Sequence, residues 1–169
     1  MKKIDILSDT HGFVHHNLFS FFKDCNEIWH AGDIGSENVL IELEQIAPVK
    51  AVFGNCDDWN IRKLTSETLI FDCEAHKVAI THIAGNPNNY SLLARNIIEN
   101  EKPTILVGGH SHILRVQHDS KNNLLFINPG SAGKTGIHTH ITFLRFDIAG
   151  KTISNLEVYD QLKQKVLEL

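Results

Sequence analysis

Metal-binding side chains follow five aliphatic segments of the chain, each within a few residues of the end of its segment. In chain order they are Asp9 and His11 after residues 4–7, Asp33 after 28–31, Asn55 after 49–53, His82 after 78–80, and His110 and His112 after 104–107. Ligands of open α/β sheets bind beyond the carboxyl ends of the strands, so five such segments can converge on one site. Carboxylate, imidazole and amide donors without thiolate suit Mn, Fe, Zn or Ni ions. The sequence therefore predicts a metal site at one edge of a sheet.

The spacing within two of these groups supports the prediction. Asp9 and His11 are two residues apart, and so are His110 and His112. In extended backbone, residues i and i+2 project to the same side, so each pair is expected to face one site. An isolated Asp-x-His or Gly-Asp is usually an ordinary turn. The metal prediction depends on all five groups occurring together, each after a predicted strand.

The composition narrows the classes of protein to consider. The chain has 169 residues, of which 42% are hydrophobic and 21% charged, with a formal net charge of -4. This length predicts a single domain over residues 1–169. There is no stripe of lysine and arginine, so non-specific binding to nucleic acid is not expected. The apolar runs are far shorter than the roughly 20 residues that span a membrane, so no membrane partner is expected.

Cysteine and histidine usage bears on location and chemistry. Three cysteines, Cys25, Cys56 and Cys73, make no disulfide framework and are typical of a reducing compartment. The first residues reach an acidic residue at once and hold no apolar signal core, so a cytoplasmic location is expected. Eleven histidines beside so few cysteines favour a metal site of nitrogen and oxygen donors.

Aliphatic strands alternate with helical segments over the first two thirds of the chain, which is typical of βαβ units. Strands are predicted over 4–7, 27–30 and 49–53, and helices over 13–24 and from an N-cap at Ser36 to Pro48. A hairpin over 68–81, a helix over 90–100 and a strand over 104–107 follow, and the rest is predicted to be all strand, with reversals at 121–123 and 149–150. The pattern predicts an α/β fold in which two packed sheets are flanked by helices.

The ordered motifs resemble those of the calcineurin-like metallophosphoesterase superfamily. They read Asp-x-His at 9–11, Gly-Asp at 32–33, Gly-Asn at 54–55, His at 82 and Gly-His-x-His at 109–112. The short chain and the Gly-Asn-Cys-Asp sequence at 54–57 are similar to the small single-domain YfcE-type phosphodiesterases, and residues 128–131 resemble another loop of these proteins. The resemblance implies an α/β/β/α sandwich of two mixed sheets and a phosphodiesterase in which Asn55, Cys56 and His82 act in catalysis.

The resemblance also implies two sets of metal ligands that share one carboxylate. Asp9, His11, Asp33 and His112 would hold one divalent ion, and Asp33, Asn55, His82 and His110 would hold the second. Manganese is the expected metal, with iron, zinc or nickel as alternatives. Two divalent ions outweigh the negative charge of two aspartates and a bridging hydroxide, so the site attracts a small phosphate ester although the chain is acidic.

The expected mechanism is attack on phosphorus by the hydroxide that bridges the two ions. No phosphoenzyme is expected, because these loops hold no paired side-chain nucleophile. A homo-oligomer is an expectation from the resemblance alone.

Two positions depart from the pattern of many relatives. Cys56 stands where they have a histidine, and a neutral thiol is a poor substitute for a cationic imidazole. The YfcE-type proteins also have cysteine there, so a substrate-facing role and inert packing both stay open for Cys56. Ile83 follows His82, where many relatives have glycine and then histidine. This departure bears on substrate specificity more than on catalysis.

The remaining histidines are expected to lie outside the metal shell. His15 and His16 are expected on the exposed surface of the helix over 13–24, and His30 is expected to fix the loop of Asp33 by a hydrogen bond. His138 and His140 follow a glycine-rich segment that could cover the substrate. That segment lacks the spacing and the helix of a nucleotide-binding P-loop, so nucleoside triphosphates are not expected.

Two other functions remain open besides a phosphodiesterase. One is a phosphomonoesterase of the same fold. The other is a non-catalytic scaffold that resembles the retromer cargo-recognition subunit, in which the metal site is degraded. All seven metal-binding positions are present in this chain, which favours an enzyme.

Overall fold

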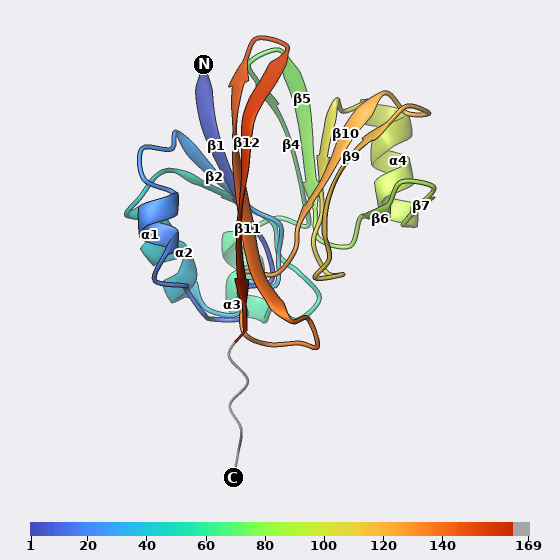
Figure 1. Ribbon diagram of the computed structural model, residues 1–169. Coiled ribbons are helices and arrows are strands. Elements are labelled where there is room, and N and C mark those ends of the chain that lie inside the picture. The colour runs from blue at the N-terminus through green and yellow to red at the C-terminus, as the bar shows by residue number, and fades with distance from the viewer. Residues whose placement is uncertain (164–169) are drawn as a thin grey trace.

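The structure, a computed structural model, describes residues 1–163, which form two five-stranded β-sheets packed face to face (Figure 1). The first sheet contains β1 (Lys2–Leu7), β2 (Glu27–His30), β3 (Val49–Ala51), β11 (His140–Ala149) and β12 (Thr152–Leu162), in the order β12-β11-β1-β2-β3. The second contains β4 (Thr68–Cys73), β5 (His76–Thr81), β8 (Ile105–Val107), β9 (Leu114–Asp119) and β10 (Leu124–Pro129), in the order β4-β5-β8-β10-β9. Both sheets are mixed, since parallel and antiparallel pairs occur in each.

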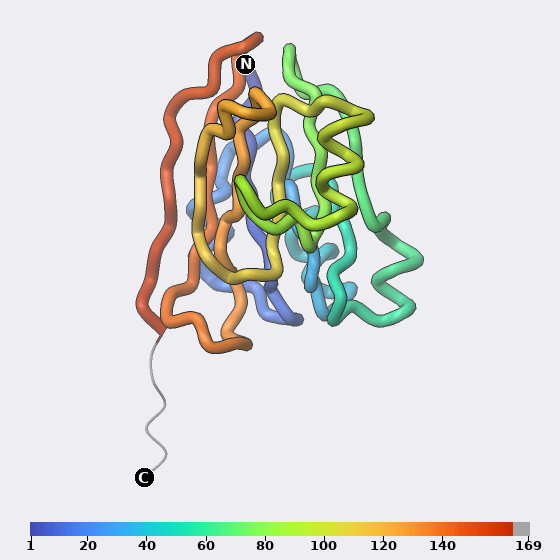
Figure 2. The backbone as a smooth tube through the Cα atoms, turned by 90° about the vertical axis from the view of Figure 1, so that its right-hand side faces the viewer, coloured from blue at the N-terminus to red at the C-terminus, as the bar shows by residue number. Residues whose placement is uncertain are grey.

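Helices cover the outer faces of both sheets. They are α1 (Leu18–Phe21), α2 (Glu37–Glu44), α3 (Trp59–Leu64) and α4 (Leu92–Glu101), and a small hairpin of β6 (Gly85–Asn86) and β7 (Asn89–Tyr90) precedes α4. Helices α1 and α2 lie on the side of the first sheet, and α4 lies on the side of the second (Figure 1). In Figure 2 the yellow-green α4 lies in front of the second sheet. The predicted α/β/β/α sandwich is confirmed.

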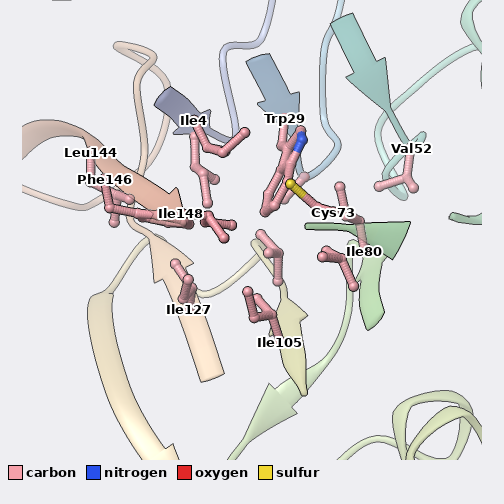
Figure 3. Packing of buried hydrophobic residues seen from close by; sticks show 14 residues of the cluster. Ile4, Trp29, Val52, Cys73, Ile80, Ile105, Ile127, Leu144, Phe146 and Ile148 are labelled. Atoms are coloured by element: carbon pink, nitrogen blue, oxygen red, sulfur yellow. The ribbon is translucent and has the colours of Figure 1, made fainter. Parts of the chain in front are cut away.

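Side chains alternate between the two faces of each strand and so build three apolar layers. Ile4, Trp29 and Ile105 belong to the cluster between the two sheets (Figure 3). Leu7, from the other face of β1, packs with the helices of the first sheet. Leu106, from the other face of β8, packs with α4. Neighbouring residues of a strand face opposite sides, so one strand contributes to two layers.

The helix predicted over residues 13–24 is shorter in the structure, where α1 covers only Leu18–Phe21. Its N-cap, Asn17, makes no side-chain capping bond. The preceding residues form turns in which the Phe13 amide donates to the Thr10 carbonyl at 3.0 Å. Phenylalanine, valine, histidine and asparagine are weak helix formers, so packing rather than helix propensity decides this segment.

The same packing buries His15, which was expected on an exposed helix surface. Its side chain is 3% exposed and lies near the rings of Phe143 and Tyr159, with centroid distances of 6.2 and 5.4 Å. The prediction was wrong for His15, because no regular helix presents it to solvent. His16 is exposed, as expected.

Two elements were not predicted, and one strand is shorter than expected. Helix α3 begins at the N-cap Asp58, whose side chain accepts a hydrogen bond from the Ile61 amide at 3.1 Å. The hairpin of β6 and β7 lies at the start of the predicted helix over 90–100 and just before it, where no strand was predicted. Strand β3 ends at Ala51, and Val52 makes only an isolated bridge to Ser66. Short elements of this kind leave too few periodic positions for a sequence pattern to detect.

Among residues 1–163, no helix combines the length and the apolar character that crossing a bilayer requires.

Asp5 is a buried carboxylate on β1, between Ile4 and Ile6. It is 1% exposed, and neither of its oxygens has a hydrogen-bond partner of ordinary geometry among the described residues. Burial raises the pKa of Asp5 to about 7, against the opposing effects of the Cys25 thiol and the Arg145 guanidinium. An unfolded aspartate has a pKa near 3.9, so the folded chain binds this proton more tightly than the unfolded chain does.

We expect the free energy of unfolding to fall as the pH rises from about 4 to about 7, because only the folded state keeps Asp5 protonated there. At about 1.4 kcal/mol for each pKa unit, the loss reaches up to about 4 kcal/mol. Asp5→Asn removes this titration, and its chemical denaturation should lack that part of the pH slope. The control is Asp72→Asn, at an exposed carboxylate of β4. A slope as steep in Asp5→Asn as in the wild type contradicts the prediction.

Candidate metal centre

The carboxyl ends of the parallel strands meet at one edge of the sandwich. In the first sheet β1 pairs in parallel with β2, and β2 with β3. In the second sheet β8 pairs in parallel with both β5 and β10. The loops that follow these strands carry all seven predicted ligands, and they lie at the end of the molecule opposite the N-terminus of β1 (Figure 1).

The structure brings six of the seven predicted ligands into two groups of donor atoms. Asp9, His11 and His112 form one group, and Asp33, His82 and His110 form the other, with the donor atoms of each group all within 4.8 Å of one another. In the first group, His112 Nε2 lies 3.0 Å from Asp9 Oδ1. In the second, His82 Nε2 lies 3.3 Å from Asp33 Oδ2.

The two groups adjoin each other through their carboxylates. Asp33 Oδ2 is also 3.9 Å from His11 Nε2, and Asp9 Oδ1 is also 3.9 Å from His82 Nε2. Asp33 therefore contacts imidazoles of both groups through one oxygen. Asp33, which the resemblance implies as the shared carboxylate, lies between the two groups.

Three atoms of these groups are buried and lack a hydrogen-bond partner among the described residues. They are Asp9 Oδ1, His11 Nε2 and His82 Nε2. Buried polar atoms without partners are costly, and a cation is the partner that a carboxylate oxygen and an imidazole lone pair share. The donor set is nitrogen and oxygen, as divalent transition-metal sites require. The residues present therefore fit a metal centre.

The backbone at the ligands is not extended, as the spacing argument assumed. Asp9, His11, Asp33, His110 and His112 all have positive φ, between 48° and 66°. They are five of the eleven non-glycine residues with positive φ in the described chain. Each left-handed residue costs roughly 1 kcal/mol, and such strain concentrates at functional sites. Both Asp-x-His and His-x-His face the site through tight left-handed turns, so the expected convergence is correct but its assumed geometry is wrong.

Asp57 connects two of the ligand loops, and the sequence analysis assigned it no role. Its carboxylate is 4% exposed and accepts three backbone hydrogen bonds. The amides of Ile34 and Gly35 donate at 3.1 and 2.7 Å, and the Gly54 amide donates at 2.8 Å. The loop after β2, which carries Asp33, is thereby held to the loop after β3, which carries Asn55.

The end of β10 and the loop after it hold the ligand loops after β1 and β8. Ser131 Oγ donates to the Asp9 carbonyl at 3.1 Å, and the Gly133 amide donates to the same oxygen at 3.1 Å. Asn128 Nδ2 donates to the Gly109 carbonyl at 2.8 Å. Asp9 and the His110 loop are also joined directly, because the His110 amide donates to Asp9 Oδ2 at 3.1 Å.

Gly54 is required by the close approach of a ligand. A Cβ atom added there would lie 2.0 Å from Asp33 Oδ1. Gly109 is similar, since its Cβ would lie 2.1 Å from Ser8 Oγ and 2.9 Å from Asp9 Oδ2. A side chain at either position would displace a carboxylate of the centre.

Hydrogen bonds set the protonation of the central residues. Burial raises the pKa of Asp33, but the nearby His82 imidazole and the hydrogen bond from the Cys56 amide outweigh it and hold that pKa well below its usual range. Burial lowers the pKa of His82, but its contacts with Asp33 and Asp9 outweigh this and raise it. His82 Nδ1 donates to the Ala31 carbonyl at 2.7 Å, which leaves Nε2 facing the carboxylates.

The predicted catalytic residues lie beside this centre. Asn55 and His82 line a cavity of about 310 Å³. Cys56 is exposed, its amide donates to Asp33 Oδ1 at 2.8 Å, and its sulfur lies within 4.8 Å of donor atoms of His11 and Asp33. Burial and the neighbouring Asp33 carboxylate raise the pKa of the Cys56 thiol. This location favours a site-facing Cys56 over inert packing.

His30 has the structural role that was predicted. It is fully buried, its Nε2 lies 2.9 Å from Thr10 Oγ1, and its Nδ1 accepts from the Gly32 amide at 3.1 Å. Burial lowers the pKa of His30 to about 4, so the ring is neutral at physiological pH.

His138, expected only in a covering loop, contacts a predicted ligand directly, with its Nδ1 2.8 Å from His112 Nδ1.

A two-sheet sandwich with carboxylate and imidazole donors gathered at its strand ends defines a metal-dependent hydrolase. Residues 2–151 match the model of the calcineurin-like phosphoesterase superfamily domain. A probable metallophosphoesterase of Methanothermobacter thermautotrophicus is 32% identical over 136 residues, which cover 76% of each chain. The chain belongs to the calcineurin-like phosphoesterase superfamily.

Solved structures share the fold at lower identity. Vps29 of Chaetomium thermophilum superposes with a TM-score of 0.77 at 15% identity, over 95% of this chain and 97% of that one. Vps29 of Entamoeba histolytica, solved with zinc, superposes with a TM-score of 0.70 at 17% identity, over 95% and 98% of the two chains. These similarities concern the fold, so the function of this chain must be argued from its own site.

We expect Asp57→Asn to loosen the metal centre. An asparagine has one acceptor oxygen where three backbone amides now donate to a charged carboxylate. Metal affinity, measured by competition with a chelator, should fall about ten- to hundredfold, and the free energy of unfolding by about 2 to 3 kcal/mol.

Asp58→Asn is the matched control, one residue away. Asp58 caps α3, where asparagine serves nearly as well, so both quantities should stay close to the wild type. Equal metal affinity in the two variants contradicts a role for Asp57 in holding the centre.

Proposed function

We propose that this metallophosphoesterase is a phosphodiesterase that uses two divalent ions, manganese first among them. The observation that carries the proposal is the placement of Asp33 Oδ2 between His11 Nε2 at 3.9 Å and His82 Nε2 at 3.3 Å. A carboxylate between two imidazole groups suits the bridging ligand of a two-metal centre. Bound ions would polarise the phosphoryl oxygens and supply a hydroxide nucleophile from water.

The ligand sets of the proposal follow the two groups of donor atoms. Asp9, His11, Asp33 and His112 would hold one ion, and Asp33, Asn55, His82 and His110 the other. Asn55 is exposed beside Cys56, with its amide nitrogen 3.4 Å from the Cys56 sulfur. Asn55 and His82 line one cavity, which supports the assignment of both to the same ion.

Two cavities beside the centre support a diester rather than a monoester. The cavity of about 310 Å³ that holds Asn55 and His82 has Phe53, Ile83 and Leu93 in its walls. A second cavity, of about 120 Å³, holds His110 and shares Ile83. A diester carries two ester groups, one for each cavity, whereas a monoester would fill only one of them.

The cellular setting of the proposal rests on the composition. We infer a cytoplasmic enzyme that acts on a small phosphate diester. The three cysteines are free thiols, as is typical of a reducing compartment, and the chain has no stripe of lysine and arginine for a nucleic-acid backbone. Assembly into a homo-oligomer remains part of the proposal.

A non-catalytic scaffold is the second candidate function. The shared fold of Vps29 favours it, but the presence of all seven predicted metal-binding residues opposes it.

Purified protein should hydrolyse bis-p-nitrophenyl phosphate with a higher kcat/KM than p-nitrophenyl phosphate when Mn²⁺ is added. Asp33→Asn should lower the rate by about a hundredfold or more, because it removes the charge shared by both donor groups. Asp72→Asn serves as the control. A preference for the monoester would identify a phosphomonoesterase, and inactivity on both esters with metal bound would favour the scaffold.

The position of Cys56 allows a neutral thiol to donate a hydrogen bond to the leaving oxygen. Because a poor leaving group needs this help most, Cys56→Ala should lower kcat about tenfold on a phenyl diester and less on a p-nitrophenyl diester. Cys25→Ala, at a half-buried cysteine outside the donor groups, is the control. Unchanged turnover on both esters would show that Cys56 only fills space.

A further inference from the structure

His138 touches His112 on the side of the ring away from the metal-facing nitrogen. The two Nδ1 atoms are 2.8 Å apart, and the rings lie edge to face with centroids 4.7 Å apart. His138 comes from the loop between β10 and β11, and 26 residues separate it from His112. Two nitrogens at this distance share one hydrogen atom, so one ring must donate and the other must accept.

The surroundings of His138 determine which nitrogen of its ring carries the hydrogen. His138 Nε2 lies 3.1 Å from the Gly133 carbonyl, which can only accept, so Nε2 is the donor. The Lys163 ammonium lies 3.4 Å from His138 Nδ1. The positive charge of this ammonium group opposes a second proton on the ring, so Nδ1 keeps its lone pair.

His112 must therefore donate from its Nδ1 to His138 Nδ1. A neutral imidazole carries one hydrogen, so His112 Nε2 is left with a lone pair. That nitrogen lies 3.0 Å from Asp9 Oδ1, inside the first donor group, but makes no hydrogen bond to it. His82 is oriented in the same way in the second group, where Nδ1 donates to the Ala31 carbonyl.

The backbone is closely fitted around this pair of rings. Gly136 has φ of +110°, and a Cβ atom added there would lie 2.7 Å from His112 Nδ1 and 3.0 Å from His138 Nδ1. Only a glycine lets the loop approach both nitrogens so closely. Lys163 Nζ also donates to the carbonyls of Lys134 and Gly136 at 2.8 and 3.3 Å, which ties β12 to the same loop.

We propose that His138 is a positioning residue that holds His112 as the Nδ1–H tautomer, with Nε2 ready to bind metal. The chain of hydrogen bonds runs from His112 through His138 to the Gly133 carbonyl. The glycine-rich loop thereby controls how tightly one of the two metal positions is held. This inference rests on the metal centre of the proposed function but not on its catalytic activity.

The first test compares metal affinity in variants of the full chain. Zn²⁺ and Mn²⁺ binding to metal-free protein is measured by competition with a chelator. His138→Leu should weaken binding at one of the two positions about ten- to hundredfold and leave the other unchanged. His138→Asn, whose amide oxygen can take the place of Nδ1, should restore most of the affinity. His140→Leu is the control, since that exposed ring pairs with Asp160.

A second comparison shows that His138 acts through His112. In the His112→Ala background, His138→Leu should cause no further loss of affinity, because the ring that it positions is gone. Wild-type affinity in His138→Leu would overturn the proposal. Equal loss at both metal positions, or an equal further loss in the His112→Ala background, would overturn it too, because both would indicate a general disturbance of the loop.

The wild-type protein provides a measurement that needs no folded variant. In ¹⁵N-labelled, zinc-loaded protein, NMR should show His112 protonated at Nδ1 and His138 protonated at Nε2 only. A proton on His138 Nδ1 would overturn the proposal. Neither measurement uses turnover, so a protein that binds metal but hydrolyses no diester would refute the proposed function and leave this test intact.

Discussion

The buried carboxylate of Asp33 is the constraint on which the rest of the site depends. It is 3% exposed, lies between His11 and His82, and accepts the Cys56 amide. A buried charge is costly unless neighbouring groups compensate it. The loops around it are shaped accordingly: Gly54 leaves room for one oxygen, and the imidazoles of both sheets face the other. A negative charge would destabilise an apolar core. Here it makes this edge of the sandwich suitable for divalent ions.

The sandwich holds these donors in place with strained backbone and many loop-to-loop hydrogen bonds. Five ligand residues adopt left-handed conformations, which an isolated loop would not keep. Asp57 joins the loops after β2 and β3, while Asn128 in β10 and Ser131 just after it hold the loops after β8 and β1. These contacts fix the loops that carry the donor atoms, which limits the reorganisation that metal binding needs. The two sheets act as a base, and the apolar layer between them sets how close the donors of one sheet lie to those of the other.

The same fold serves Vps29 and proteins named as phosphoesterases, so the architecture alone does not define activity. In this chain the distinguishing features are local. The thiol of Cys56 beside the centre, the apolar Ile83 shared by two cavities, and the imidazole of His138 behind His112 all lie within or around the metal site. Each is proposed to affect a different property: leaving-group chemistry, ester selectivity and metal affinity.

The sequence by itself determined the ligand types, their order after successive strands, and the alternation that builds two sheets. These are local properties, because hydrophobic periodicity and side-chain chemistry can be identified along a few residues. It did not determine the left-handed turns at the ligands, the burial of His15, or the roles of Asp57 and His138. Those depend on which loops meet: β11 returns beside β1, and β10 beside β8, so residues far apart in the chain become neighbours. Hydrogen bonds between such loops leave no periodic trace in the sequence, and only the tertiary structure decided them.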